Sequence, residues 1–402
     1  MRWPYAGGVL RLDHAIRRYP WGSPTAIPEL LGLPLGDTPV AEIWLGAHRL
    51  APAMVARGED DFGISLTEVI AHNLVAALGK DNTGELPYML KLLGVGRPLS
   101  MQVHPTTEQA RAGYDLEEAA GLDLDAPNRS YKDPNAKPEM LYSLTSFEAL
   151  SGFRPVEQIR TLLAPLVGES AIATKMAEAM KQPAAAALQA ALSEALRGRA
   201  TTPEGIAELA AACRRQLARP SGDPGAYALC STLAKRFPGD GAVAASLLLC
   251  HLAMAPGEAF FVPPGTLHAY QRGLAVEVLG PSDNVIRAGM SGKHVDQERL
   301  INTVDYCGRG PVRPLVRRDG PARIMRPPVA DFQLADIRLD GTYECPLSGP
   351  RVALVLAGQV TAFTSVGSMH VSRGQALFAM ANEGPIKLRG RGRMILVAPG
   401  PA

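Results

Sequence analysis

The 402-residue chain has few cysteines, few aromatic residues, almost no net charge and no long apolar run. The five cysteines are odd in number, widely spaced and free of any C-x-x-C pair. This pattern argues against a disulfide framework and predicts reduced thiols in a reducing compartment. The net charge of +2 excludes a global attraction to nucleic acid or to an anionic membrane, so any anion must be recognised locally.

Membrane and export signals are also missing. The longest apolar run, residues 242–255, is interrupted by His251 and is too short to span a bilayer. Residues 1–18 lack the continuous apolar core of a signal peptide, so the cytoplasm is the expected compartment. The arginines of 309–326 and 389–393 are interpreted as solvated surface, because no aromatic interleaving or RNA-binding motif accompanies them. Neither a membrane nor a nucleic acid is an expected partner.

The chain does have the composition of a soluble globular protein, with 47% hydrophobic and 20% charged residues, and a length suited to two or three domains. Short apolar runs broken by Pro and Gly predict strands, whereas an Ala-, Leu-, Glu- and Lys-rich block predicts helices. We therefore expect a mainly β protein with an α-helical insertion. The expected parts are a discontinuous catalytic unit of residues 1–153 and 245–318, a helical insertion at 154–244, and a C-terminal β unit at 319–402.

Polar residues alternate with apolar ones in the segment LSMQVHP. Side chains of an extended segment alternate between faces, so Ser100, Gln102 and His104 share one face. The same spacing in NAKPEM places Lys137 and Glu139 on one side. Both segments are therefore predicted to present polar side chains to a common cavity.

A second histidine, His268, stands just past a tight Pro-Gly turn in PPGTLHAY. The three segments together offer a Gln oxygen, two His nitrogens and a Glu oxygen, a donor set that suits zinc. Spacing alone does not establish such a site, because a lone histidine is more often a structural or surface residue. We interpret the remaining histidines as structural or surface residues: His14, His48, His72, His251, His294 and His370.

Several longer strings occur together in one order: PLSMQVHP, YKDPNAKPEM, FVPPGTLHAY and GPSDNVIRAGMSGKHVD. With YPWGS and AEIWLGAH near the N-terminus, they make the chain closely resemble the type I mannose-6-phosphate isomerase family over nearly its whole length. The resemblance implies two cupin (jelly-roll) β-barrel units plus a helical domain. It also implies an isomerase of mannose metabolism and GDP-mannose biosynthesis that holds one zinc ion and interconverts mannose 6-phosphate and fructose 6-phosphate through an enediol.

The site residues implied by the resemblance follow from the matching motifs. The family's zinc ligands fall on Gln102, His104, Glu139 and His268. Its active-site arginine falls on Arg287, its lysine beside the metal on Lys137, and a pocket carboxylate on Glu277. Ser100 and Lys293 match positions associated with the phosphate end of the substrate.

One position departs from the family pattern. The family usually has N-H-K-P-E where this chain has Ala136 in N-A-K-P-E. An imidazole sometimes proposed to help open the sugar ring is therefore absent. Either that role is dispensable, or another group fills it, such as Asp283 or a metal-bound water.

Three roles stay open at this point. Lys137, two residues from a metal ligand, is the candidate general base. Glu277 lies in an apolar strand and is either a base or the partner that holds Lys137 or Arg287. Trp21 either lines the sugar pocket or belongs to the core.

The expected partner is a small hexose phosphate, and the expected state is a monomer because no apolar association surface can be read from the sequence. Two alternatives compete with this prediction. One is a related zinc sugar-phosphate isomerase of broader substrate range. The other is a non-catalytic cupin sugar-binding protein, against which Lys137, Arg287 and the complete ligand set argue.

Overall fold

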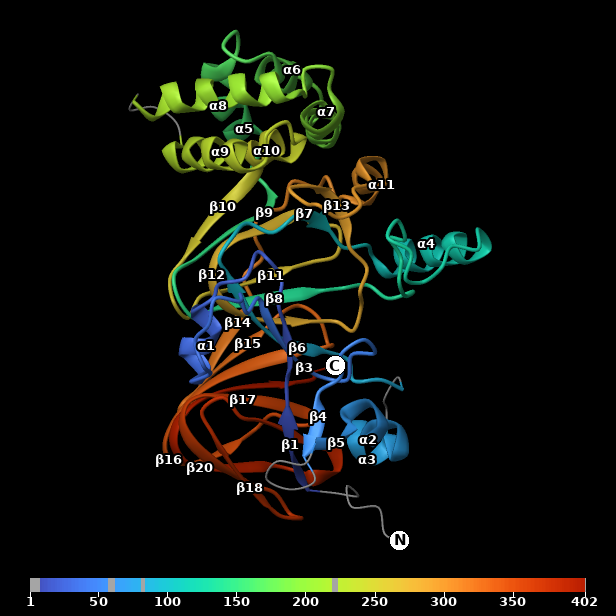
Figure 1. Cartoon of the computed structure of the whole chain (residues 1–402), viewed down its shortest axis with the longest axis vertical. Coiled ribbons are helices and arrows are strands. Elements are labelled where there is room, and N and C mark those ends of the chain that lie inside the picture. Colours follow the sequence, from blue (N-terminus) through green and yellow to red (C-terminus); the bar gives the residue numbers. More distant parts are fainter. Residues whose placement is uncertain (1–7, 57–61, 81–83, 219–222, 402) are drawn as a thin grey trace.

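The fold is known from a computed structural model that describes residues 8–56, 62–80, 84–218 and 223–401. These residues form three parts stacked along the long axis, with helices at one end and β-sheets in the middle and at the other end (Figure 1). The predicted mainly β fold with a helical insertion is confirmed. Among the helices of the described residues, none has the length and apolarity needed to cross a membrane.

The middle part is an antiparallel sheet that carries most of the predicted site residues. Its main path runs through β10 (Leu249–Met254), β9 (Phe147–Phe153), β12 (His268–Leu279), β6 (Met89–Val95), β3 (Glu42–Leu45) and β2 (Ala15–Arg17). Strands β7 (Met101–Val103), β8 (Glu139–Ser143), β11 (Ala259–Val262) and β13 (Ile286–Gly289) pair beside this path. Helices α4 (Thr107–Ala119) and α11 (Gln297–Thr303) flank it, with α4 projecting to one side (Figure 1).

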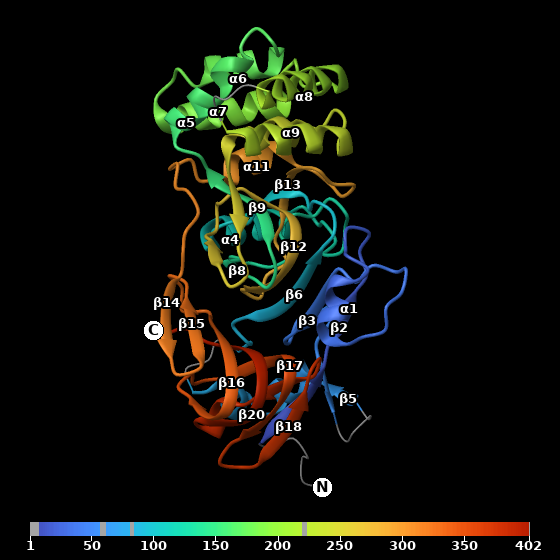
Figure 2. The same ribbon diagram turned by 90° about the vertical axis from the view of Figure 1, so that its left-hand side faces the viewer.

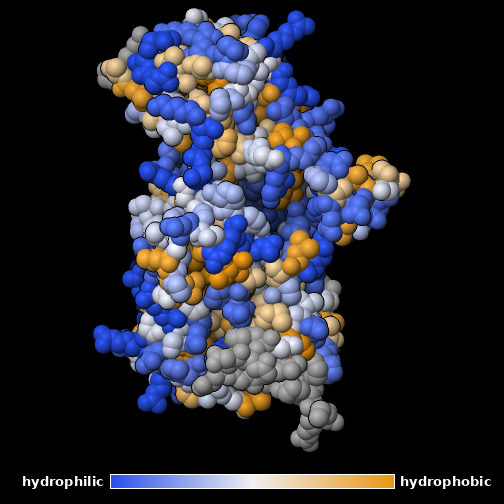
Figure 3. Space-filling view, in the orientation of Figure 1, coloured by the Kyte–Doolittle hydropathy of each residue, from blue (hydrophilic) through white to orange (hydrophobic). Residues whose placement is uncertain are grey.

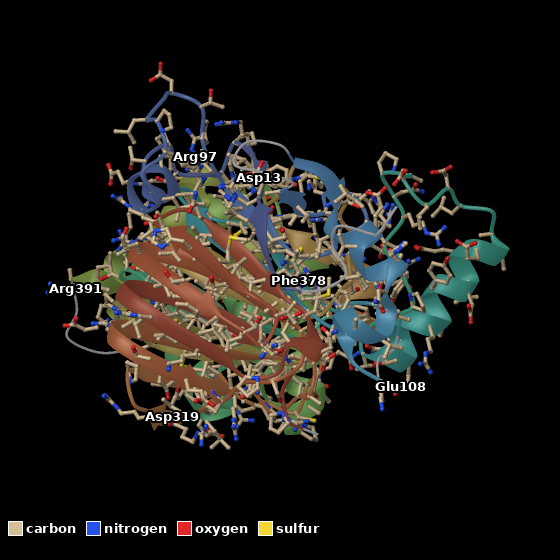
Figure 4. All side chains as sticks on the ribbon, turned by 90° about the horizontal axis from the view of Figure 1, so that it is seen from below. Asp13, Arg97, Glu108, Asp319, Phe378 and Arg391 are labelled. Atoms are coloured by element: carbon tan, nitrogen blue, oxygen red, sulfur yellow. The ribbon has the colours of Figure 1, made fainter. Side chains whose placement is uncertain are left out.

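The C-terminal part is a second antiparallel sheet. Its path runs through β14 (Leu315–Asp319), β15 (Ala322–Arg326), β16 (Gln333–Cys345), β20 (Ile386–Ala398), β17 (Arg351–Phe363), β19 (Ala376–Ala379), β1 (Val9–Asp13), β4 (Met54–Ala56) and β5 (Phe62–Ser65), with β18 (Ser368–Ser372) paired to β17. Seen from below, Phe378 lies inside this part, whereas Arg391 lies at its outer edge (Figure 4). Short helices α1 (Ala26–Leu31), α2 (Leu66–His72) and α3 (Leu74–Leu78) come from the N-terminal third of the chain.

An N-terminal strand belongs to the C-terminal sheet. Strand β1 pairs with β19 from Val9 opposite Ala379 onward, and β4 and β5 extend that edge. We expected residues 1–153 to belong wholly to the catalytic unit. Instead, β1, β4 and β5 pair within the C-terminal sheet. Local alternation predicts that a segment is a strand, but it carries no information about which distant strand will be its partner.

The helical insertion shares one apolar core with the middle sheet, whose buried residues Met101, Leu150 and Ile286 belong to the same cluster. Its helices are α5 (Val156–Leu163), α6 (Ala171–Ala179), α7 (Ala184–Arg197), α8 (Pro203–Leu217), α9 (Pro224–Arg236) and α10 (Gly241–Ala245). The leucines at helical spacing, Leu188, Leu192 and Leu196, are all buried on one face of α7. Figure 2 shows this block seated on the middle sheet, next to β9 and β13.

A buried polar junction joins the two β parts. The hydroxyl of Tyr142 on β8 donates a hydrogen bond to Oδ2 of Asp336 on β16 at 2.6 Å. Arg393 on β20 bonds the other oxygen, Oδ1, at 2.9 Å. The Asp336 side chain is only 1% exposed, so both partners are needed to offset its desolvation.

Replacing Tyr142 with Phe is expected to lower the free energy of unfolding by about 1–3 kcal/mol, because Asp336 loses a donor and stays buried. Urea unfolding followed by circular dichroism measures this. Tyr114→Phe is the matched control: its ring faces Arg129, and its hydroxyl has no hydrogen bond among the described residues. Superimposable unfolding curves for Tyr142→Phe and the parent would contradict the assigned role.

Candidate functional site

Three predicted site residues lie in one row across neighbouring strands. In the antiparallel register, Gln102 of β7 lies opposite His268 of β12 on one side and opposite Arg287 of β13 on the other. Directly opposed residues of antiparallel strands project from the same face. The strand pairing thus brings together residues from three distant segments.

Two histidines, one of which is His268 of this row, converge on one carboxylate. His104 Nε2 lies 3.2 Å from Glu139 Oε1, and His268 Nε2 lies 3.5 Å from Glu139 Oε2. All three side chains are at most 1% exposed. Among the described residues these three also form the group whose ligand atoms all lie within 4.8 Å of one another, the arrangement needed to hold a metal ion.

The hydrogen bonds of the two imidazoles show that this cluster fits a cation. His104 Nδ1 lies 2.6 Å from the Asn284 carbonyl, and His268 Nδ1 lies 2.9 Å from the Thr266 carbonyl. Each Nδ1 therefore donates its proton to a carbonyl, which leaves both Nε2 atoms as acceptors aimed at Glu139. Within the part of the chain that the structure describes, His104 Nε2 has no hydrogen-bond partner. Buried acceptors that face one another are stable when a shared cation lies between them.

The electrostatics of the cluster support the same conclusion. Burial alone would raise the pKa of the Glu139 carboxyl, but the adjacent Lys137 holds that pKa well below its usual value. Burial lowers the pKa of His104, with Lys137 adding to the effect, and lowers that of His268 to about 4. At neutral pH the site therefore consists of a carboxylate and two neutral imidazoles, the protonation state that binds metal ions.

Gln102 completes the predicted ligand set. Its Nε2 lies 3.4 Å from His268 Nε2, and its Oε1 accepts a hydrogen bond from Ser100 Oγ at 3.0 Å. Because the two ends of an amide are assigned from such contacts, a half turn of the group places Oε1 toward the histidines. The predicted shared face of Ser100 and Gln102 is thus present as a direct contact.

A second row of side chains forms the floor of the site. Trp44 of β3 lies opposite Lys91 of β6, which lies opposite Glu277 of β12. Lys91 Nζ sits 4.7 Å from the Trp44 ring centroid and 3.8 Å from Glu277 Oε2. Glu277 is thus paired with Lys91, while no ion pair joins it to Lys137 or Arg287 among the described residues. Burial, with the charge of Glu139, raises the pKa of Glu277 to about 7.

Sequence reasoning did not single out Lys91 or Tyr270, although each carries a readable signal. Lys91 is the one charged residue in the apolar run YMLKLLGV. Tyr270 lies two residues after His268 and therefore shares its face. The Tyr270 hydroxyl donates to Glu139 Oε2 at 3.1 Å, and Lys137 Nζ lies 2.9 Å from Oε1.

These residues open onto a cavity of about 750 Å³, large enough for a phosphorylated sugar. The predicted residues that line it are Trp21, Ser100, Gln102, Lys137, Glu139, Glu277, Asp283, Arg287 and Lys293, whereas His104 and His268 lie beneath it. Nine lysines and arginines and five carboxylates contribute to the lining, so the cavity favours an anion. Arg236 and Phe237 reach it from the end of α9.

The outer part of the cavity combines aromatic and cationic groups. Trp21 stacks on Tyr19 at 5.7 Å between ring centroids, and Lys293 Nζ lies 5.5 Å from the Tyr19 ring. Burial lowers the pKa of Lys293, and the charge of Arg287 lowers it further. The molecular face in Figure 3 is largely hydrophilic, with separate small apolar patches. The cationic lining, rather than the surface as a whole, therefore makes the cavity a local site for an anion.

Comparison with known proteins gives a consistent family assignment. A family model described as "Phosphomannose isomerase type I, catalytic domain" matches residues 9–156. The mannose-6-phosphate isomerase of Escherichia coli K12 is 32% identical over 96% of this chain and 98% of its own length. The human mannose-6-phosphate isomerase is 32% identical over 93% of this chain and 94% of its own length.

Solved structures agree with the sequence relatives. A crystal structure of Salmonella typhimurium mannose 6-phosphate isomerase, described as bound to its substrate (f6p) and a zinc atom, superimposes with a TM-score of 0.87. It is 30% identical and covers 98% of this chain and 100% of its own. Sequence identity of 30–32% over nearly the full length of both chains indicates a common fold and a common ancestor. The chain therefore belongs to the type I mannose-6-phosphate isomerase family.

Proposed function

We propose that this chain interconverts mannose 6-phosphate and fructose 6-phosphate and that one zinc ion is its cofactor. The observation that carries the proposal is the buried cluster of His104, Glu139 and His268 at the base of a cation-lined cavity. The relatives' activity and the zinc and fructose 6-phosphate named for the Salmonella structure support it. These findings favour this reaction over the broader isomerase and the non-catalytic alternative.

The proposed ligands are His104, Glu139, His268 and, through its amide oxygen, Gln102. Zinc held by these residues would supply Lewis acidity for the oxygens of the sugar. The bonds from His104 to Asn284 and from His268 to Thr266 hold both rings in the ligating tautomer.

Lys137 is the proposed base for the isomerisation step. Its amine takes the proton from C2 and returns it to C1, while a second proton moves from the O2 hydroxyl to O1; together these transfers convert the aldose to the ketose through the enediol. Arg287, opposite Gln102 in the sheet, presents its guanidinium to the cavity and stabilises the oxyanion. Glu277 is proposed to hold Lys91 in the floor, and the pairing of these two side chains supports that role.

Asp283 is the proposed group for opening the sugar ring. It lines the cavity, and although burial would raise its pKa, the bond from His48 and nearby cations hold the pKa below its usual value. The carboxylate is therefore ionised and ready to accept a proton. Ser100 and Lys293, which also line the cavity, are proposed to bind the phosphate, with Trp21 beside the sugar.

The proposal extends to the domain architecture, the oligomeric state, the compartment and the pathway of this chain. We propose that each β part is a cupin-type jelly roll, that residues 154–244 act as a helical insertion, and that β1, β4 and β5 serve the C-terminal unit. The chain is proposed to act as a monomer in the cytoplasm, in mannose metabolism that includes GDP-mannose biosynthesis. Cysteines without disulfides support a reducing compartment.

Removal of the metal is the first test. Chelation should abolish turnover of mannose 6-phosphate, because the two imidazoles and Glu139 lose their shared ion. Stoichiometric zinc should restore the activity, and metal analysis should find one ion per chain. Glu139→Gln should bind less metal, whereas Glu344→Gln on the exposed face of β16 should bind the parental amount. Full activity in metal-free protein would contradict the proposal.

Substitution of the candidate base is the second test. Lys137→Met should lower kcat by about 10²- to 10⁴-fold with little change in KM, because the proton at C2 loses its acceptor. Glu277→Gln should lower kcat less, since it alters a partner of Lys91. Lys387→Met, on the exposed edge of β20, is the matched control and should keep parental turnover. Near-parental turnover in Lys137→Met would show that Lys137 is not the base.

A further inference from the structure

His48 lies in the loop after β3, next to the cavity-lining residue Asp283, and is held there by three contacts. Its Nε2 lies 3.0 Å from Oδ1 of Asp283, and its Nδ1 accepts a hydrogen bond from the Leu50 backbone at 3.2 Å. The ring also meets the Trp44 ring edge-on at 4.8 Å between centroids. The His48 side chain is 7% exposed, so neither its position nor its orientation is that of a free surface histidine.

These contacts determine which nitrogen of His48 carries the proton. A backbone N–H is always a donor, so Nδ1 must present its lone pair to Leu50. The neutral ring therefore carries its proton on Nε2 and donates it to Asp283 Oδ1. The bond between the two side chains has a fixed direction, from the imidazole to the carboxylate.

The same bond determines which oxygen of Asp283 is available. Oδ1 is engaged by His48, whereas Oδ2 has no hydrogen-bond donor among the described residues. The Asp283 side chain is 27% exposed and borders the cavity. Its pKa lies below the usual value: burial would raise it, but His48, Lys137 and Lys91 lower it. One oxygen is thus anchored and the other remains open for a ligand.

We propose that His48 is a positioning residue for sugar-ring opening, acting through Asp283. The inference deepens the proposed isomerase function and rests on it. Asp283 Oδ2 takes the proton from O1 of the sugar, the electron pair forms the C1=O1 bond, and the C1–O5 bond breaks. O5 then receives that proton, so one proton moves from O1 to O5 and Asp283 is regenerated. His48 keeps its own proton and holds the carboxylate in place.

No other described histidine can take this role. The Nε2 atoms of His104 and His268 face Glu139, and position 136 carries only a methyl group. His48 is the imidazole within hydrogen-bond distance of Asp283. The sequence alone placed it with the structural and surface histidines.

The test measures ring opening separately from isomerisation. Enzyme-catalysed exchange between the α and β anomers of mannose 6-phosphate, followed by NMR, requires ring opening and reclosure but no transfer of the C2 proton. His48→Leu fills the space beside Trp44 and removes the donor, so anomer exchange should slow by at least about tenfold, the loss expected for one hydrogen bond to a charged group. His48→Gln restores a donor and should recover most of the rate.

Further readouts separate positioning from a structural role. In an Asp283→Asn background, His48→Leu should cause no additional loss, because both changes remove the same function. With substrate deuterated at C2, the isotope effect on kcat should shrink in His48→Leu as ring opening becomes limiting. His370→Leu on the exposed face of β18 is the control and should leave both rates unchanged.

Nitrogen NMR of the His48 ring gives a readout that does not depend on whether a variant folds. The resting enzyme should show the Nε2–H tautomer, and a proton on Nδ1 would overturn the inference. Unchanged anomer exchange in folded His48→Leu would also overturn it, as would additive losses in the double variant. A parent enzyme that exchanges anomers but fails to isomerise mannose 6-phosphate would instead contradict the proposed function.

Discussion

The buried charge of Glu139 is the interaction on which the site depends. A carboxylate that is 1% exposed must be compensated, and removing one partner of a buried ion pair costs about 3–5 kcal/mol. Lys137 and the Tyr270 hydroxyl each contact one of its oxygens, and the neutral imidazoles of His104 and His268 face it. Because the two Nε2 atoms and the carboxylate face one another, the arrangement also fits a shared metal ion.

The middle sheet supplies the rigidity that such a centre needs. One row of opposed residues crosses β12, β7 and β13, and a second crosses β3, β6 and β12. Neighbouring strands lie about 4.8 Å apart, so the side chains of one row lie close enough to contact one small ligand. The helical insertion adds Arg236 to the cavity from the end of α9, where a further cation favours an anionic group.

Two carboxylates of the cavity have opposite environments, and each is paired with a different partner. Glu277 is buried beside Glu139 and Lys91, and its pKa is raised to about 7. Asp283 is closer to solvent, receives a bond from His48, and has a lowered pKa. Groups whose environments separate their pKa values are suited to different steps of one reaction. This difference in pKa is the reason for proposing different roles for the two side chains.

Local patterns in the sequence determined several features correctly. Alternation in LSMQVHP placed Ser100 and Gln102 on one face, and leucine spacing predicted the buried face of α7. The family strings named the ligand candidates. Only the tertiary structure decided that β1 joins the C-terminal sheet, that Lys91 pairs with Glu277, and that His48 bonds Asp283. The physical reason is that periodicity reports the face of a residue within its own segment, whereas these contacts join segments far apart in the chain.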